Sequence, residues 1–223
     1  MSNLAMQTIQ VKNSIKLAAL RAGYGPVQLV AVTKTVAAER VREALALGLT
    51  SFGESRVQEA LPKLALFPQA DWHFLGRLQT NKVRDVVGNF ALIHSLDRWK
   101  LAVALQAEAQ RRGSMVRALV QVNIGQEDQK GGLDVAEVKG FLQEASTLSK
   151  VRIEGLMAVP PASENPEEIR PYFRKMYQLY SKLQVPGVQM KILSMGMSND
   201  FVIAVEEGAN LVRVGSLLFG ERT

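Results

Sequence analysis

Hydrophobic residues near the start of the chain recur at helical spacing over residues 4–22. The pattern is carried by Leu4, Ile9, Val11, Ile15, Leu17 and Leu20. Gly23 and the pair Gly25-Pro26 interrupt it, as residues that end helices do. The sequence therefore begins with a predicted helix over residues 4–22.

Beyond this helix, short apolar runs alternate with stretches of helical periodicity. The β-prone runs lie near residues 27–33, 50–53, 72–76, 91–95, 115–124, 151–159, 189–194 and 210–214. The helical stretches are residues 38–47, 55–66, 80–88, 97–111, 134–149, 166–184 and 198–207. Gly48, Gly113 and Gly208 each follow such a stretch, where a left-handed cap is wanted. The pattern predicts about eight strands that alternate with helices.

Repeated strand–helix alternation implies parallel strands joined by crossover helices. Eight such strands without a visible boundary favour an α/β fold, a (β/α)8 TIM-type barrel in one domain over residues 1–223. An open doubly wound sheet is the alternative, but residues 33–38 lack its glycine-rich nucleotide turn. Only residues 216–223 follow the last strand. We therefore expect the last outer helix to be missing and the extra N-terminal helix to cover the gap.

Composition narrows the class of protein. The 223 residues are 47% hydrophobic and 22% charged, which suits one large globular core. No run approaches the roughly 18 apolar residues that cross a bilayer, and the start lacks a basic region before an apolar one. The chain has 0 Cys, which excludes disulfides, thiolate nucleophiles and cysteine metal sites. We expect a cytoplasmic protein with no membrane contact.

The net charge of +6 could attract nucleic acid or anionic small molecules. Basic residues are spread over the helical segments, and runs such as Arg111-Arg112 are short. They are not interleaved with aromatic residues, as a nucleic-acid stacking platform requires. We therefore do not expect nucleic-acid binding.

Lys34 ends the apolar run of residues 27–33, where a charged amine is costly to bury. Because desolvation disfavours the ammonium form, such an amine can be partly neutral near pH 7 and attack an aldehyde to form a Schiff base. The alternative is a lysine that leaves its strand and reaches solvent.

Two turns of small residues, 194–199 and 213–216, each follow a short apolar strand late in the chain. In a barrel, phosphates commonly bind in the loops after strands 7 and 8. Gly196, Gly215 and serines such as Ser216 would let backbone amides approach an anion closely. Ser198 or Asn199 could start a helix whose N-terminus adds its dipole. Barrel closure sets strand 8 beside strand 1 and brings this cradle to Lys34. An amine beside an anion cradle indicates pyridoxal 5′-phosphate (PLP) as the cofactor.

Arg213 shares a strand face with residues 211 and 215, so it points towards the same site as Gly215. A guanidinium only donates hydrogen bonds, so a pyridine nitrogen that it contacts must stay unprotonated. Such a ring is a poor electron sink, which permits Schiff-base chemistry but weakens carbanion stabilisation. The alternative partner for Arg213 is a buried carboxylate such as Glu54.

The two histidines and two of the methionines could act chemically, but each also has a structural interpretation. His73 and His94 lie in predicted strands without a third ligand at metal spacing, so they are expected in the core or at its rim rather than at a metal. Met195 and Met197 either pack against a cofactor ring or fill core space.

Several segments closely resemble the pyridoxal phosphate homeostasis proteins over nearly the whole chain. The matching segments are residues 31–35, 52–54, 72–76, 78–82, 155–157, 194–198, 212–216 and 219–220. The resemblance implies a barrel like the N-terminal domain of alanine racemase, with PLP on Lys34 and its phosphate around Ser194, Gly215 and Ser216. It also implies buffering or delivery of the cofactor without established catalysis. Ser55 stands where the family usually has an Asn at the ring, and Lys130 resembles a loop lysine that accepts or passes on cofactor.

Three functions follow as alternatives. The first is a PLP-holding homeostasis protein, expected to be monomeric, that contacts PLP-dependent apoenzymes transiently. The second is an amino-acid racemase-like enzyme, which needs acid and base groups on both faces of its substrate. The third is a barrel that binds another phosphorylated metabolite without a covalent bond.

Overall fold

The computed structural model describes residues 2–127 and 131–220. Its strands are β1 (Gln28–Val32), β2 (Ser51–Glu54), β3 (Asp71–Phe74), β4 (Leu92–Leu96), β5 (Val116–Val122), β6 (Val151–Ala158), β7 (Ile192–Ser194) and β8 (Leu211–Val214). Its helices are α1 (Asn3–Ala22), α2 (Ala38–Ala46), α3 (Val57–Leu66), α4 (Val83–Val86), α5 (Trp99–Arg112), α6 (Val138–Ala145), α7 (Arg170–Lys182), α8 (Phe201–Glu206) and α9 (Ser216–Phe219). Two 3₁₀ turns, η1 (Thr80–Lys82) and η2 (Pro166–Ile169), precede α4 and α7.

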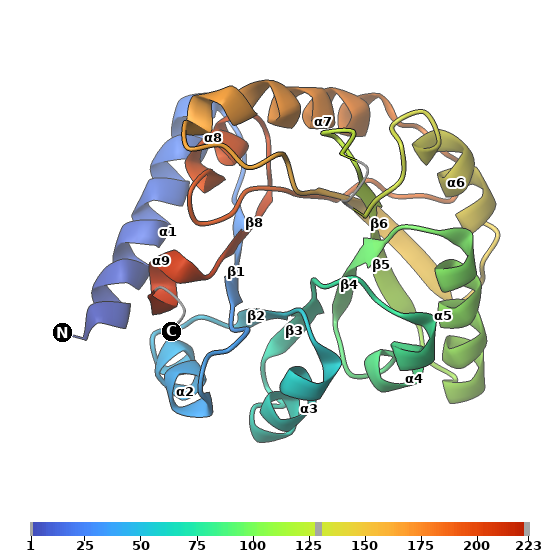
Figure 1. Ribbon diagram of the computed structural model, residues 1–223, viewed down its shortest axis with the longest axis horizontal. Coiled ribbons are helices and arrows are strands. Elements are labelled where there is room, and N and C mark those ends of the chain that lie inside the picture. Colours follow the sequence, from blue (N-terminus) through green and yellow to red (C-terminus); the bar gives the residue numbers. More distant parts are fainter. Residues whose placement is uncertain (1, 128–130, 221–223) are drawn as a thin grey trace.

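The strands form a closed parallel barrel in chain order, with the helices around it (Figure 1). Closure comes from β1 and β8, which pair in parallel from Gln28 opposite Leu211 to Ala31 opposite Val214. The predicted TIM-type barrel is confirmed, and the open doubly wound sheet is wrong. Over the described residues, no helix is both long enough and apolar enough to span a bilayer.

Helix α1 is the extra N-terminal helix. It begins after Ser2, whose hydroxyl accepts a hydrogen bond from the Ala5 N–H at 3.3 Å, and it ends at Gly23 in the left-handed conformation. It lies alongside α8 and α9, at the left of the view in Figure 1, and so covers the gap as expected. The last outer helix, expected to be missing, is reduced to α9, a single helical turn that buries Leu218.

Some predicted elements are shorter than their patterns. The helix expected over 134–149 is α6 alone, since residues 134–137 form a turn in which the Glu137 N–H bonds to the Asp134 carbonyl. The strand expected over 189–194 is reduced to β7. The helix expected over 198–207 begins only at Phe201, after Asp200, so Ser198 does not start it. In each case the apolar pattern extends beyond the residues whose backbone hydrogen bonds form the element.

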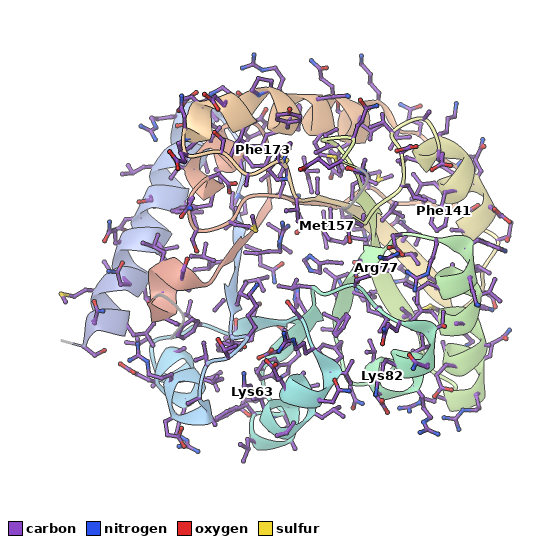
Figure 2. The ribbon with its side chains drawn as sticks, in the orientation of Figure 1. Lys63, Arg77, Lys82, Phe141, Met157 and Phe173 are labelled. Atoms are coloured by element: carbon purple, nitrogen blue, oxygen red, sulfur yellow. The ribbon has the colours of Figure 1, made fainter. Side chains whose placement is uncertain are left out.

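The described residues form two apolar cores. The larger lies between the barrel and the helices and includes Phe173 of α7. The smaller lies inside the barrel and is formed by Val30, Leu92, Leu119, Met157 and Leu211. Figure 2 shows Met157 near the middle of the barrel, and Phe173 beneath α7.

Polar side chains share the inner face with this smaller core. His94, Ser194 and Arg213 each follow an inward apolar residue of the same strand by two positions, towards the carboxyl end. The interior therefore changes from apolar to polar at the end of the barrel where active sites lie.

Candidate functional site

A cavity of about 210 Å³ opens where β1 and β8 end. Lys34 and Thr35 line it from the segment after β1, and Gly215 and Ser216 line it from the turn after β8. Barrel closure thus brings together residues that lie about 180 positions apart in the chain, as expected. Arg40 of α2 also lines the cavity and supplies a second cationic side chain, which sequence reasoning missed.

Lys34 is half-buried at the end of β1. Both backbone polar groups of Thr33, the residue before it, are hydrogen-bonded. The Thr33 N–H donates to the Gly53 carbonyl at 2.9 Å, and the Thr33 carbonyl accepts from Lys63 Nζ at 2.7 Å. Thr35, the residue after it, has a φ of 65°, a left-handed conformation that is uncommon for a β-branched residue. The backbone that carries Lys34 is therefore fixed by its neighbours.

A buried ion pair supports this strand end from outside the barrel. Glu54 is fully buried, and one of its oxygens accepts hydrogen bonds at 2.7 Å from Lys63 Nζ and from the Thr33 hydroxyl. Lys63 lies on α3, facing the barrel. Sequence reasoning missed Lys63, although a lysine nine positions after a strand-ending glutamate was the available signal.

The two small-residue turns are joined by Ser198. Its hydroxyl oxygen accepts hydrogen bonds from the backbone N–H groups of Gly215 at 3.2 Å and Leu217 at 3.3 Å. Gly196 has a φ of 91°, and a Cβ there would lie 2.5 Å from the Cβ of Ala204, so only glycine fits. Its carbonyl accepts from the Arg213 N–H at 3.0 Å. The turns expected to hold an anion are therefore one connected unit.

The Ser198→Ala variant is expected to lower the free energy of unfolding by about 1–3 kcal/mol, because two backbone N–H groups lose their acceptor. Urea unfolding measures this change, and Ser181→Ala, an exposed hydroxyl on α7, is the matched control. A loss no larger than that of the control would show that Ser198 does not join the turns.

Arg213 points into the barrel and is almost fully buried. It donates to the hydroxyl oxygen of Ser194 at 2.6 Å and to the Ala158 carbonyl at 3.0 Å. Across residues 2–127 and 131–220 it forms no salt bridge, and the alternative pairing with Glu54 is wrong because Glu54 faces α3. Burial lowers the pKa of Arg213 to about 10, and the carboxyl of Asp200 opposes this shift.

The two histidines continue this polar chain across the interior. His94 Nδ1 lies 3.0 Å from Ser194 Oγ, and His94 Nε2 lies 2.9 Å from His73 Nδ1. Burial lowers the pKa of His73 to about 4, with a smaller effect from Arg117. Burial, His73 and Arg213 together hold the pKa of His94 well below its usual value. Both rings are therefore neutral at pH 7, in the core as expected.

The folded protein is expected to lose stability as the pH falls below about 6.5. Histidines in the unfolded chain take up protons there, whereas the buried rings stay neutral, so protonation favours unfolding. Between pH 7.5 and 5 the free energy of unfolding should fall by about 2 kcal/mol per histidine. Urea unfolding across this range measures it, and a His73→Phe variant should show a smaller loss. Equal pH dependence in the two proteins would contradict the buried neutral state of His73.

The remaining candidate residues fall in different places. Ser194 is fully buried, with its side chain between His94 and Arg213 rather than in the cavity. Ser55 is half-buried directly after β2. Met195 is fully buried in the outer core, so it fills core space. Lys130 lies outside the described residues.

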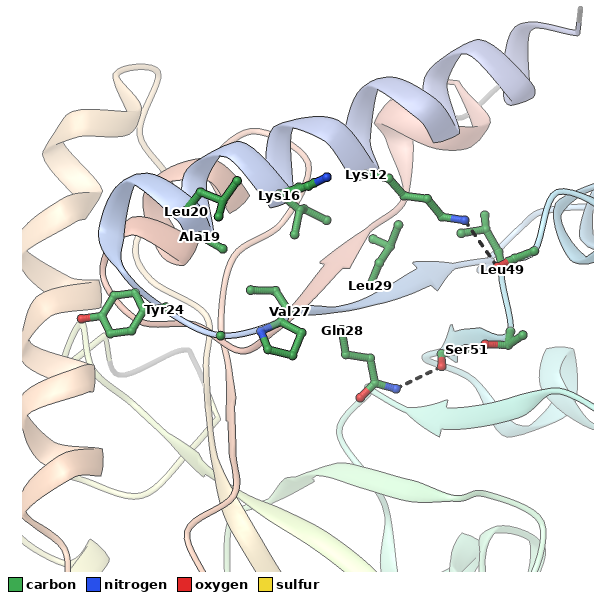
Figure 3. Close-up of a pocket in the computed structure, with 15 residues that line it drawn as sticks. Lys12, Lys16, Ala19, Leu20, Tyr24, Val27, Gln28, Leu29, Leu49 and Ser51 are labelled. Carbon is green, nitrogen blue, oxygen red and sulfur yellow. Dashed lines mark hydrogen bonds between the residues drawn. The ribbon is translucent and has the colours of Figure 1, made fainter.

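A larger cavity of about 610 Å³ lies at the other end of the barrel (Figure 3). It is bounded by α1, the start of β1 and residues 48–51, with Lys12 and Lys16 on its helical wall. None of the candidate residues that the structure describes lines it. The smaller cavity combines Lys34 with the turn after β8, which Ser198 ties to the turn after β7, and it is therefore the candidate site.

Comparison with known proteins gives matches over nearly the whole chain. The model of the alanine racemase N-terminal domain matches residues 10–223. The pyridoxal phosphate homeostasis protein of Aquifex aeolicus is 45% identical over 225 residues, 99% of each chain. That of Escherichia coli K12 is 34% identical over 230 residues, 100% of this chain and 98% of its own.

Solved structures agree with this similarity. PipY of Synechococcus elongatus, described with PLP bound, is 40% identical with a TM-score of 0.81, over 93% of this chain and 99% of its own. Alanine racemase of Corynebacterium glutamicum is 17% identical with a TM-score of 0.71, over 99% of this chain and 61% of its own. At that identity the racemase likeness concerns the fold alone.

Proposed function

Because the chain belongs to the pyridoxal phosphate homeostasis protein family, we propose that it holds PLP reversibly as a Schiff base on Lys34 and buffers or delivers it to other proteins. The observation that carries this proposal is the cavity that joins Lys34 to Gly215 and Ser216. PLP requires an amine for its aldehyde and hydrogen-bond donors for its phosphate. The cavity offers both, and a 40% identical relative is described with PLP bound.

The residues divide into three roles in this proposal. Lys34 supplies the amine. Gly196, Ser198, Gly215 and Ser216 form the connected turns that hold the phosphate, and the guanidinium of Arg40 adds positive charge beside them. Ser194 acts from inside the barrel, by fixing Arg213, and Met195 has no direct role.

Arg213 favours holding the cofactor over catalysis. When bound, PLP supplies an electrophilic aldehyde and, if its ring nitrogen is protonated, an electron sink. The Arg213 guanidinium has no acceptor lone pair, so it can only donate to that nitrogen, which must then remain unprotonated. Its neutral partners Ser194 and Ala158 leave its charge without a carboxylate in direct contact. The residue therefore reduces the carbanion stabilisation that a racemase uses.

The test compares delivery of PLP to another enzyme with catalysis by the PLP-loaded protein itself. Protein loaded with PLP is mixed with the apo form of a PLP-dependent enzyme, and recovery of that enzyme's activity is followed. We expect recovery with the wild-type protein, in contrast to the Lys34→Ala variant prepared in the same way. Racemisation of amino acids by the loaded protein alone, well above that by free PLP, would favour the enzyme instead.

A phosphate-only barrel is distinguished by the same preparation. Such a protein would bind PLP and inorganic phosphate competitively but would give no adduct that borohydride reduces.

Size-exclusion chromatography with light scattering tests the further proposal that the chain is a monomer. A stable dimer would give a measured mass twice that of the chain, which is 24.5 kDa.

A further inference from the structure

A chain of hydrogen bonds inside the barrel links Arg213 to the two histidines. It runs from His73 on β3 through His94 on β4 and Ser194 on β7 to Arg213 on β8. All four side chains are nearly or fully buried. None of the four lines the cavity, but Arg213 lies two residues before Gly215, which does, so the two histidines and Ser194 act on the site through Arg213.

The order of donors and acceptors in this chain follows from its chemistry. Arg213 can only donate, so the Ser194 oxygen must accept from it. The oxygen could also accept from an Nδ1–H of His94, but the hydroxyl proton would then lack an acceptor, because the other hydrogen bond of this hydroxyl among the described residues is the one it accepts from Arg213. We therefore assign the proton of Ser194 to His94 Nδ1, at 3.0 Å. With Nδ1 accepting, a neutral His94 carries its proton on Nε2 and donates it to His73 Nδ1, at 2.9 Å. His73 must in turn carry its proton on Nε2.

We propose that His94 and His73 are positioning residues, a neutral pair with both protons on Nε2, which aligns Ser194 as the acceptor that holds Arg213. This inference rests on the proposed function, because the orientation of Arg213 matters there for the pyridine ring of PLP. A protonated histidine at either position would reverse or remove one hydrogen bond of the chain. It would also add a cation to an interior that already faces Arg117 and Arg213.

The histidine count makes the tautomers directly measurable. The sequence contains 2 His, so a sample labelled with ¹⁵N-histidine gives two ring systems, which a His73→Phe variant assigns. We expect both rings of the PLP-free protein to be neutral at pH 7, with protons on Nε2. A proton on Nδ1 of either ring, or an imidazolium at pH 6, would overturn the proposal. A merely space-filling role would not select this tautomer in both rings.

The second measurement is PLP affinity. His94→Phe removes the acceptor of the Ser194 hydroxyl, and we expect the dissociation constant for PLP to rise by about tenfold, the size of one net hydrogen bond. His94→Gln, whose amide can bond in the same place, should recover part of the loss. Wild-type affinity in His94→Phe would overturn the positioning role.

The two measurements separate the possible failures. If His94→Phe does not fold, the wild-type tautomers still test the proposal, since they require no substitution. If the wild-type protein binds no PLP, the proposed function fails whatever the tautomers are. If it binds PLP and either ring carries its proton on Nδ1, only the positioning role fails.

Discussion

The Lys34→Ala variant is expected to lose the entire visible absorption change that PLP produces on binding the wild-type protein. An alanine has no amine with which to form a Schiff base, so any remaining PLP would be held by its phosphate alone. The change concerns one half-buried side chain at the edge of the cavity, and the fold should be preserved. Titration of the variant with PLP, followed by absorbance, measures the effect.

The matched control is Lys12→Ala, at the larger cavity on the other side of the barrel. Lys12 is exposed, and its Nζ reaches only backbone carbonyls at 3.4 and 3.5 Å. It should leave the PLP spectrum unchanged. A full absorption change in Lys34→Ala would move the covalent site to another lysine.

The Lys63→Met variant is expected to lower the free energy of unfolding by about 3–5 kcal/mol. Methionine has a similar length but no charge, so the fully buried Glu54 would lose its counter-ion. A loss of this size is a large part of the roughly 5–15 kcal/mol that stabilises a typical protein. Urea unfolding at pH 7 measures it.

Two further variants test the cause. Lys175→Met replaces an exposed lysine on α7 and should change stability by no more than about 0.5 kcal/mol. The double variant Glu54→Gln with Lys63→Met removes the buried charge and should recover part of the loss. If Lys63→Met behaves like Lys175→Met, the ion pair does not support the strand end before Lys34.

The barrel was predictable because two signals agreed. Alternating strand and helix patterns required parallel pairing, and the repeated alternation suited closure. Element ends were less predictable, as α6 and β7 show, because they depend on backbone hydrogen bonds with segments distant in sequence. The single turn of α9 depends likewise on its packing against α1.

The site was predictable where topology alone decided it. Closure of β1 against β8 was enough to join Lys34 with Gly215. The suggested pairing of Arg213 with Glu54 failed because the two residues face opposite sides of the barrel wall. Glu54 shares its face with Phe52, which packs in the outer core, and this strand parity was readable from the sequence.

The contacts of Ser194 could not be read in the same way. Its bond to His94 joins β7 and β4, which are not neighbours in the barrel, and the bond of His94 to His73 depends on the register of β3 and β4. Strand patterns give the face of each residue but not how far one strand is shifted along the next. The polar chain behind Arg213 therefore emerged only from the structure.

Reduction of the PLP-treated wild-type protein with borohydride, followed by peptide mapping of the modified lysine, shows directly whether Lys34 carries the cofactor. We expect one stable pyridoxyl adduct, on Lys34. No adduct after incubation with PLP, or an adduct spread over exposed lysines with none on Lys34, would contradict this expectation.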